Sequence, residues 1–211
     1  MENSDSLREH IVNLLTKAEA HVDVRSELES FPTKLRGRKP PGAPHTPWQL
    51  LEHIRIAQWD ILRFSVDANH ASPKWPEGYW PENDTPPSDK AWEKSVRQFL
   101  ADLNAMCELV RDPARDLLAR IPHGTGQTLL REALLLADHN AYHLGQLVMV
   151  RKTLESEKEH GSRSRVKPPH SPKAKARKNR SARKPRKTTD KYAEWLLSRQ
   201  GTIDKDIDLE F

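Results

Sequence analysis

The sequence predicts an all-α protein: a four-helix bundle followed by a disordered basic C-terminal tail. Three observations support this fold class. Four segments repeat apolar residues at intervals of three and four, the period of an amphipathic helix. No segment shows the sustained apolar and polar alternation that is typical of strands. After about residue 155 the chain becomes rich in Lys, Arg, Pro and Ser, a composition that cannot form a core.

The first predicted helix runs from about Ser4 to Leu28, and either Ser4 or Asp5 is available as its N-cap. The apolar residues that fall on one side of it are Leu7, Ile11, Leu14 and Leu15. The stretch GRKPPGAPH, residues 37–45, follows it. Its prolines and glycines cannot continue a helix, so we expect a turn there.

The second predicted helix has the clearest start, because Thr46 is a good N-cap and Pro47 suits the first helical position. It continues to about Val66, with His53 at the edge of its apolar stripe. The stripe consists of Leu50, Ile54, Ala57, Ile61 and Phe64. A long proline-rich loop follows over residues 69–89. Loops of this length are usually functional or mobile, and its aromatic residues predict either a lid or anchors that pin the loop; they are Trp75, Tyr79 and Trp80.

Ser88 and Asp89 open the third predicted helix, which Pro113 ends. Its single cysteine, Cys107, belongs to an apolar row and is interpreted as a core residue and not as a nucleophile. A short helical piece is expected around Leu117 and Leu118. The fourth long helix then runs from about Thr128 to Leu154. Its two apolar rows contain Leu130, Leu134, Ala137, Ala141, Leu144 and Val148 in one, and Leu136, His139, His143 and Val150 in the other.

Charge divides the chain into regions. Residues 162–189 hold 12 of the 35 basic residues and no acidic one, so the remainder has 23 basic against 30 acidic side chains, a net charge of −7. We therefore predict three regions: a bundle over residues 1–155, a basic disordered linker over 156–189, and a short helix with an acidic end, itself disordered, over 190–211.

The single cysteine excludes an intramolecular disulfide framework and a cysteine-based zinc finger. No apolar run approaches the roughly 20 residues that a membrane-spanning helix needs, and the first residues do not resemble a signal peptide. The expected protein is cytoplasmic and has no membrane partner.

Two histidines one turn apart interrupt the apolar segment LLLADHNAYHLGQLVMV, residues 134–150. Side chains four apart on a helix lie about 6 Å from each other, which lets His139 and His143 converge on one metal ion. A third histidine, His53, borders the stripe of another long helix, and facing helices are where bundles build metal sites. The alternative is that each ring is hydrogen-bonded in the core or solvated. We expect the other histidines, His45 and His70 among them, to be solvated, while His123 is a candidate to approach the site from its loop.

Two stretches carry a family resemblance. DHNAYHLGQL resembles the HxxxHxGQ signature of the DinB-like (damage-inducible) superfamily of four-helix bundles, and HTPWQLLEHIRIAQWDIL is similar to its earlier histidine-bearing helix. The resemblance covers about residues 5–154. It implies one divalent metal ion, commonly nickel or zinc, held by His53, His139 and His143. Relatives in this superfamily include transferases and isomerases that use a low-molecular-weight thiol such as bacillithiol or mycothiol. Other members have no assigned reaction, and this sequence shows no pattern diagnostic of either thiol class. The resemblance therefore implies a small-molecule substrate and makes such a thiol a candidate cosubstrate, and the reaction stays open.

Three neutral ligands with open positions are typical of a catalytic site, in which the ion activates water or a thiol. Asp60 lies seven residues after His53 and Glu132 seven before His139, so each shares roughly the face of its histidine. Both are candidates for a base or an extra ligand; the alternative is an ordinary solvated carboxylate. Gln146 shares the face of His143 and is a candidate for orienting a substrate or a ring N–H.

Three functions remain open on these residues. The first is a metal-dependent enzyme of the thiol S-transferase or hydrolase kind. The second is a nucleic-acid-associated protein, because the basic run 162–189 would bind phosphate backbones without reading bases. The third is a metal-binding module without catalysis. Such bundles often pair through helix faces, so a homodimer is among the expected states.

Overall fold

The described part of the chain is helical. The computed structural model describes residues 2–17 and 19–163, and this part contains no β-strand, only an isolated bridge between Arg120 and Thr128. Its long helices are α1 (Glu2–Thr16), α3 (Pro47–Val66), α4 (Asp89–Arg111) and α5 (Leu129–Arg163). A short α2 (Val24–Glu29) and two 3-10 turns, η1 (Thr33–Leu35) and η2 (Glu77–Tyr79), lie in the connections. The all-α, four-helix prediction is confirmed.

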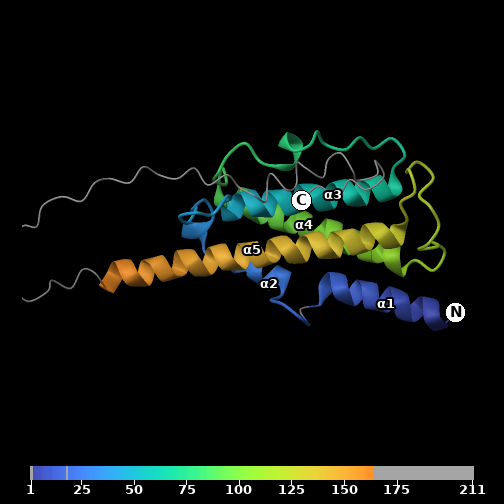
Figure 1. Cartoon of the computed structure of the whole chain (residues 1–211), viewed down its shortest axis with the longest axis horizontal. Helices are drawn as coiled ribbons and strands as arrows, with labels where there is room; N and C mark the ends of the chain where they lie inside the picture. Colours follow the sequence, from blue (N-terminus) through green and yellow to red (C-terminus); the bar gives the residue numbers. More distant parts are fainter. Residues whose placement is uncertain (1, 18, 164–211) are drawn as a thin grey trace, which may run out of the picture. The chain divides into compact units, whose positions relative to one another are not determined.

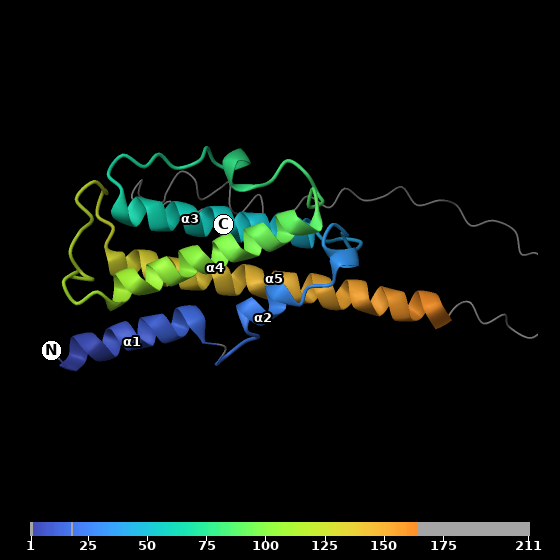
Figure 2. The ribbon, with the colours of Figure 1, turned by 180° about the vertical axis from the view of Figure 1, so that it is seen from behind.

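The long helices lie side by side, and α3 packs against both α4 and α5, while α1 packs against the same two helices (Figure 1). Figures 1 and 2 show that α3 and α4 run in one direction and that α1 and α5 run in the other. Because α3 and α4 are parallel, the chain must return before α4 can begin. The loop that contains η2 makes this return along α3.

The start of α3 is the element that the sequence predicted best. The Thr46 side chain accepts a hydrogen bond from the Gln49 amide at 3.2 Å, and the Gln49 side chain accepts one from the Thr46 amide at 2.9 Å. This reciprocal capping box, with Pro47 in the first turn, satisfies amides that a helix start leaves free. Ser88 caps α4 by one hydrogen bond only, accepted from the Ala91 amide at 3.2 Å. The predicted starts and ends of both helices are confirmed.

The predicted single helix from Ser4 to Leu28 is wrong. The structure has α1 from Glu2, so neither Ser4 nor Asp5 is its N-cap, and α2 is a separate helix. The Asp23 carboxylate caps α2 by accepting from the Ser26 amide at 2.7 Å. Because the chain changes direction between α1 and α2, Leu28 is fully buried against α4. Its carbonyl accepts a hydrogen bond from the Trp92 indole N–H.

The buried face of α1 also differs from the predicted stripe. Ile11 and Leu15 are buried as expected, but Leu7 and Leu14 are 39% and 56% exposed. Arg8 takes an inward position because its guanidinium donates to the carbonyl oxygens of Val110 at 2.6 Å and Arg115 at 2.5 Å. A carbonyl in the last turn of α4 and one just beyond it thus hold the Arg8 face of α1 toward the core.

Two further expectations are corrected near α5. Leu117 and Leu118 lie in a turn and not in a helix, with the Asp116 side chain accepting from the Leu118 amide at 2.9 Å. The fourth long helix extends to Arg163, beyond its predicted end at Leu154. Its first predicted apolar row is partly exposed, at Leu134 and Ala141. The second row is buried, and this row carries both histidines.

The apolar core lies between α1, α2 and α4 on one side and α3 and α5 on the other. Its fully buried large residues include Phe31, Trp92, Phe99, Met106 and Leu136. The predicted core position of Cys107 is confirmed: it is 1% exposed, and burial raises the pKa of its thiol.

None of the helices in the described part is long and apolar enough to cross a membrane. The first residues of the predicted linker 156–189 are helical, because α5 continues to Arg163. The rest of that linker, the predicted segment 190–211, and with them the predicted nucleic-acid contact, lie outside the described residues.

Candidate metal centre

The structure brings the three predicted histidines together. His53 comes from the middle of α3, and His139 and His143 come from successive turns of α5, so antiparallel packing of the two helices creates the cluster. One ring nitrogen from each lies within 4.8 Å of the others, a group that can hold a metal ion. The ring centroids are 4.6 to 5.0 Å apart. The exposed fractions are 1% for His53, 9% for His139 and 5% for His143.

The three imidazoles are neutral at neutral pH. Burial, and then the neighbouring His143, lower the pKa of His53 to about 4. The same causes, with His53 added, lower the pKa of His139 to about 3, and burial lowers the pKa of His143. A neutral imidazole has one N–H and one bare nitrogen, and the bare nitrogen is the form that binds a metal.

A backbone carbonyl fixes which nitrogen of His53 is bare. Its Nδ1 lies 3.1 Å from the Tyr79 carbonyl oxygen, which can only accept a hydrogen bond. Nδ1 therefore carries the proton, and Nε2 is the bare atom. This Nε2 faces the Nε2 of His139 at 3.2 Å. Donation of the single ring N–H to a carbonyl or a similar acceptor is the usual arrangement of a metal-ligating histidine.

Gln146 plays the same part for His143. The Nδ1 of His143 donates to the Gln146 side-chain oxygen at 2.7 Å, so its Nε2 is bare. That Nε2 is buried and has no hydrogen-bond partner in the described part of the chain. A buried polar atom without a partner is costly and needs an explanation. A divalent ion bound by neutral imidazoles is one, so the donor set fits the metal that the sequence predicts.

An aromatic residue of the connecting loop covers the centre. Trp80 stacks on His53 with ring centroids 4.0 Å apart and planes within 2°, and it also stacks with His45 at 4.0 Å and 16°. The expectation that His45 is solvated is therefore wrong. No helical period points to this contact, because His45 precedes the capping Thr46 and meets Trp80 only through the fold. The predicted alternative that loop aromatics anchor the loop fits Trp80.

Asp60 and Glu132 lie in a second polar cluster. Asp60 lies seven residues after His53 on α3, and Glu132 lies seven before His139 on α5. Because the two helices are antiparallel, both carboxylates lie on the same side of the triad along the bundle. Asp60 accepts from the His70 Nε2 at 2.6 Å and from the Tyr79 hydroxyl at 2.5 Å. Glu132 pairs with Arg131 at 2.7 Å, and burial raises the pKa of its carboxyl.

The interpretation of both groups as solvated carboxylates is wrong, because Asp60 is 9% and Glu132 2% exposed. The expectation that His70 is solvated is wrong as well. Neither carboxylate belongs to the histidine group, and their roles as base or extra ligand stay predictions.

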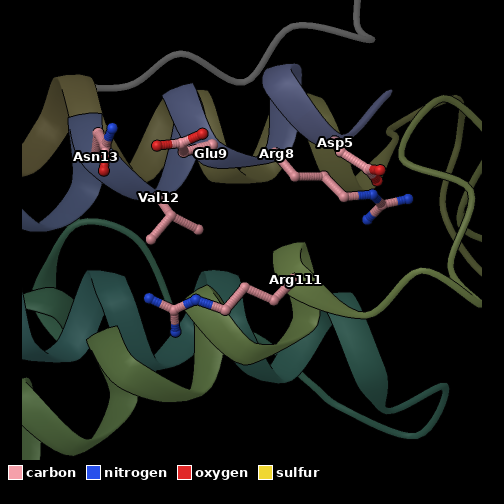
Figure 3. Close-up of a pocket in the computed structure, with 6 residues that line it drawn as sticks. All are labelled: Asp5, Arg8, Glu9, Val12, Asn13 and Arg111. Carbon is pink, nitrogen blue, oxygen red and sulfur yellow. The ribbon is translucent and has the colours of Figure 1, made fainter. Parts of the chain in front are cut away.

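Two other features lie away from the triad. His123 is exposed and its Nε2 donates to the Phe64 carbonyl at 2.6 Å, so the expectation that it approaches the centre is wrong. A cavity of about 360 Å³ lies between α1 and α4, where residues of mixed charge line it (Figure 3). They are Asp5, Arg8, Glu9, Val12, Asn13 and Arg111. Acidic and basic side chains line this cavity together, and the Arg8 guanidinium is already bonded to two carbonyls. The cavity therefore does not favour a ligand of one charge.

In a comparison with known families, the family described as the DinB superfamily matches residues 18–147. This range includes α3, the connecting loop, α4 and the histidine-bearing part of α5. No curated protein and no solved structure matches the chain.

Proposed function

The chain belongs to the DinB superfamily, and on that premise we propose that it is a metal-dependent enzyme of the thiol S-transferase or hydrolase type. His53, His139 and His143 would hold one divalent ion, with nickel and zinc as the first candidates. The substrate would be a small molecule, and a low-molecular-weight thiol is the proposed cosubstrate for the transferase reaction.

One observation carries the proposal: the Nε2 of His143 is bare, buried and unpartnered beside two other neutral imidazoles. A core built only for stability would be expected to pair this atom or replace the ring with an apolar residue. Three histidines with lowered pKa values resist protonation and stay available as ligands at neutral pH.

The number of ligands supports catalysis over a structural role. Structural zinc sites are usually closed by four protein ligands, whereas catalytic sites keep a position for water or substrate. Among the described residues, the cluster contains three histidines and no cysteine or carboxylate. When bound to such neutral ligands, a divalent ion lowers the pKa of a coordinated water or thiol and supplies hydroxide or thiolate near neutral pH.

The protein's own residues would hold the ligands in place and keep water from them. The Tyr79 carbonyl accepts the Nδ1–H of His53 and the Gln146 side-chain oxygen accepts that of His143, which fixes both tautomers. Trp80 covers one face of His53. In this proposal Gln146 orients the ligand His143, and Asp60 and Glu132 are the two candidates for the proton acceptor.

The proposal is tested by elemental analysis of protein purified without a nickel column, comparing wild type with His139→Ala. We expect about one divalent ion per chain in the wild type, held by the triad, and none in the variant. A panel of thiols and electrophiles, with hydrolysis substrates, then tests turnover. Metal that is bound without turnover by any substrate would favour the alternative, a metal-binding module without catalysis. A wild-type protein free of metal would refute the proposed site.

A further inference from the structure

We infer that Asp60 is a positioning residue: it clamps the loop between α3 and α4, so that Tyr79 and Trp80 hold His53 in one tautomer and one orientation. The value of this for metal binding rests on the proposed function. The clamp itself is a property of the protein's own contacts, and nothing in the family match assigns it.

The Asp60 carboxylate has both oxygens engaged by the loop. Its Oδ1 accepts from His70 and its Oδ2 accepts from the Tyr79 hydroxyl. Asp60 is nearly buried, and the side chain of its partner His70 is 6% exposed. Hydrogen bonds to an ionised carboxylate are among the stronger ones in proteins, particularly where little water competes. Two of them converge on this carboxylate.

Tyr79 connects the clamp to the candidate metal centre. His53 and Asp60 are two turns apart on α3, about 10 Å along the helix axis at the usual rise per residue. The Tyr79 hydroxyl reaches Asp60 at one end of this span, and the Tyr79 carbonyl meets the Nδ1 of His53 at the other. The next residue, Trp80, stacks flat on the His53 ring. Figure 2 shows this loop and η2 running along α3.

The loop has a second tether beyond the clamp. The Asp84 carbonyl accepts from the Thr46 hydroxyl at 2.6 Å, and its carboxylate accepts from the Gln49 side chain at 2.8 Å. Residues between the two tethers have little freedom to leave α3. Asp84 holds the later part of the loop, whereas Asp60 holds its earlier part through His70 and Tyr79. Loss of Asp60 would therefore release Tyr79, while the start of α3 stays capped.

The test uses metal-free protein first. Imidazole ¹⁵N spectra report which nitrogen of each histidine carries the proton, and the His53 signals are identified by their absence in His53→Ala. The wild type should show His53 with the proton on Nδ1 alone. Tyr79→Phe, which removes only the hydroxyl, and Asp60→Ala, which removes both acceptors, should show both tautomers. Asp60→Asn keeps one acceptor oxygen and should lie between them.

The second readout is a Ni²⁺ titration of the same proteins in competition with a chromophoric chelator. Tyr79→Phe and Asp60→Ala should weaken Ni²⁺ binding by about tenfold, the lower end of the range for lost outer-shell partners. Asp102→Asn is the matched control, because Asp102 is a carboxylate of similar burial on α4 that pairs with Gln98 and not with the loop. It should keep the wild-type spectrum and affinity.

A single Nδ1–H tautomer and wild-type Ni²⁺ affinity in both Tyr79→Phe and Asp60→Ala would overturn the inference. Failure of the proposed function has a different result: the wild type binds no Ni²⁺, or His53→Ala binds it as well as wild type. In that case the ¹⁵N spectra alone still decide whether Asp60 positions His53, since they need no metal. If Asp60→Ala does not fold, the conservative Tyr79→Phe variant decides.

Discussion

Two polar clusters lie along the same pair of antiparallel helices, and they differ in how their buried atoms are partnered. Around Asp60 and Glu132, each carboxylate has a donor from the chain: His70 and Tyr79 for the first, Arg131 for the second. In the triad, the outer nitrogens of His53 and His143 are bonded, but the inner Nε2 of His143 has no partner among the described residues.

The difference indicates what each cluster is for. A buried polar group needs a partner, and a cluster that provides its own partners stabilises or orders the fold. A cluster that leaves a bare, buried nitrogen without a donor, as at His143, leaves that need to a ligand. Both clusters lie on α3 and α5, so the contrast does not depend on a difference in scaffold. Variants of the triad and variants of the Arg131–Glu132 pair should therefore give different kinds of effect, while Asp60 connects the two clusters through the loop.

The largest effect is expected from removing a ligand. His143→Ala should lower the affinity for Ni²⁺ or Zn²⁺ by more than the roughly 100-fold that marks the loss of an outer-shell partner. Competition with a chromophoric chelator measures this. His123→Ala is the matched control, because His123 is an exposed histidine bonded to a loop carbonyl away from the triad. Equal metal affinity in the two variants would contradict the assignment of the ligands.

The second-largest loss of metal affinity is expected from removing Gln146, which is hydrogen-bonded to the ligand His143. Gln146→Leu removes the acceptor for the His143 Nδ1 proton while it keeps a side chain of similar size. Metal affinity should fall by about 10- to 100-fold, since outer-shell acceptors orient the ring and fix its tautomer. Gln98→Leu, an exposed glutamine on α4, provides the control. An unchanged affinity in Gln146→Leu would mean that His143 is held by packing alone.

A smaller effect, of another kind, is expected in the paired cluster. Arg131→Ala leaves the Glu132 carboxylate buried without its donor. Unfolding in urea at neutral pH should show a loss of about 1–3 kcal/mol, the usual cost of an unsatisfied buried group. Metal affinity should stay at the wild-type value. A large loss of metal affinity with unchanged stability would reverse the contrast between the clusters.

The smallest effect is a pH dependence. Burial raises the pKa of Glu132 in the folded protein, with the Asp60 charge adding to it. The folded state therefore keeps the proton to a higher pH than the unfolded chain does. The stability from this group is present below its ordinary pKa and is lost as the pH rises through the folded-state pKa.

Glu132→Gln has no such proton. Urea midpoints measured from about pH 4 to about pH 8 should show wild-type stability falling relative to the variant as the pH rises. Profiles that stay parallel would show that Glu132 titrates as it does in the unfolded chain.

The sequence predicted those parts of the fold that local chemistry determines. Thr46 with Pro47, and Ser88 with Asp89, place the starts of α3 and α4 because caps act within one turn. The convergence of His53 with the α5 pair could be predicted, since two histidines one turn apart share a face and a third borders a facing stripe. These patterns need no knowledge of distant contacts.

The errors arose where a distant contact decides the outcome. Arg8 is turned inward by carbonyls from the end of α4, which no helical period in α1 reveals. His45 and His70 lie in connections, and each acquires its neighbour only after the long loop returns along α3. The same holds for the Tyr79 carbonyl, which as a backbone atom has no residue-type signal at all.

Arg8 has a consequence for the mechanics of the bundle. Helices that touch through aliphatic side chains alone can slide past one another by a turn and repack with similar neighbours. The Arg8 guanidinium donates to the carbonyls of Val110 and Arg115, so any axial shift of α1 would break both hydrogen bonds. It would leave a buried cation and two acceptors without partners. The first helix is thereby locked in register against α4.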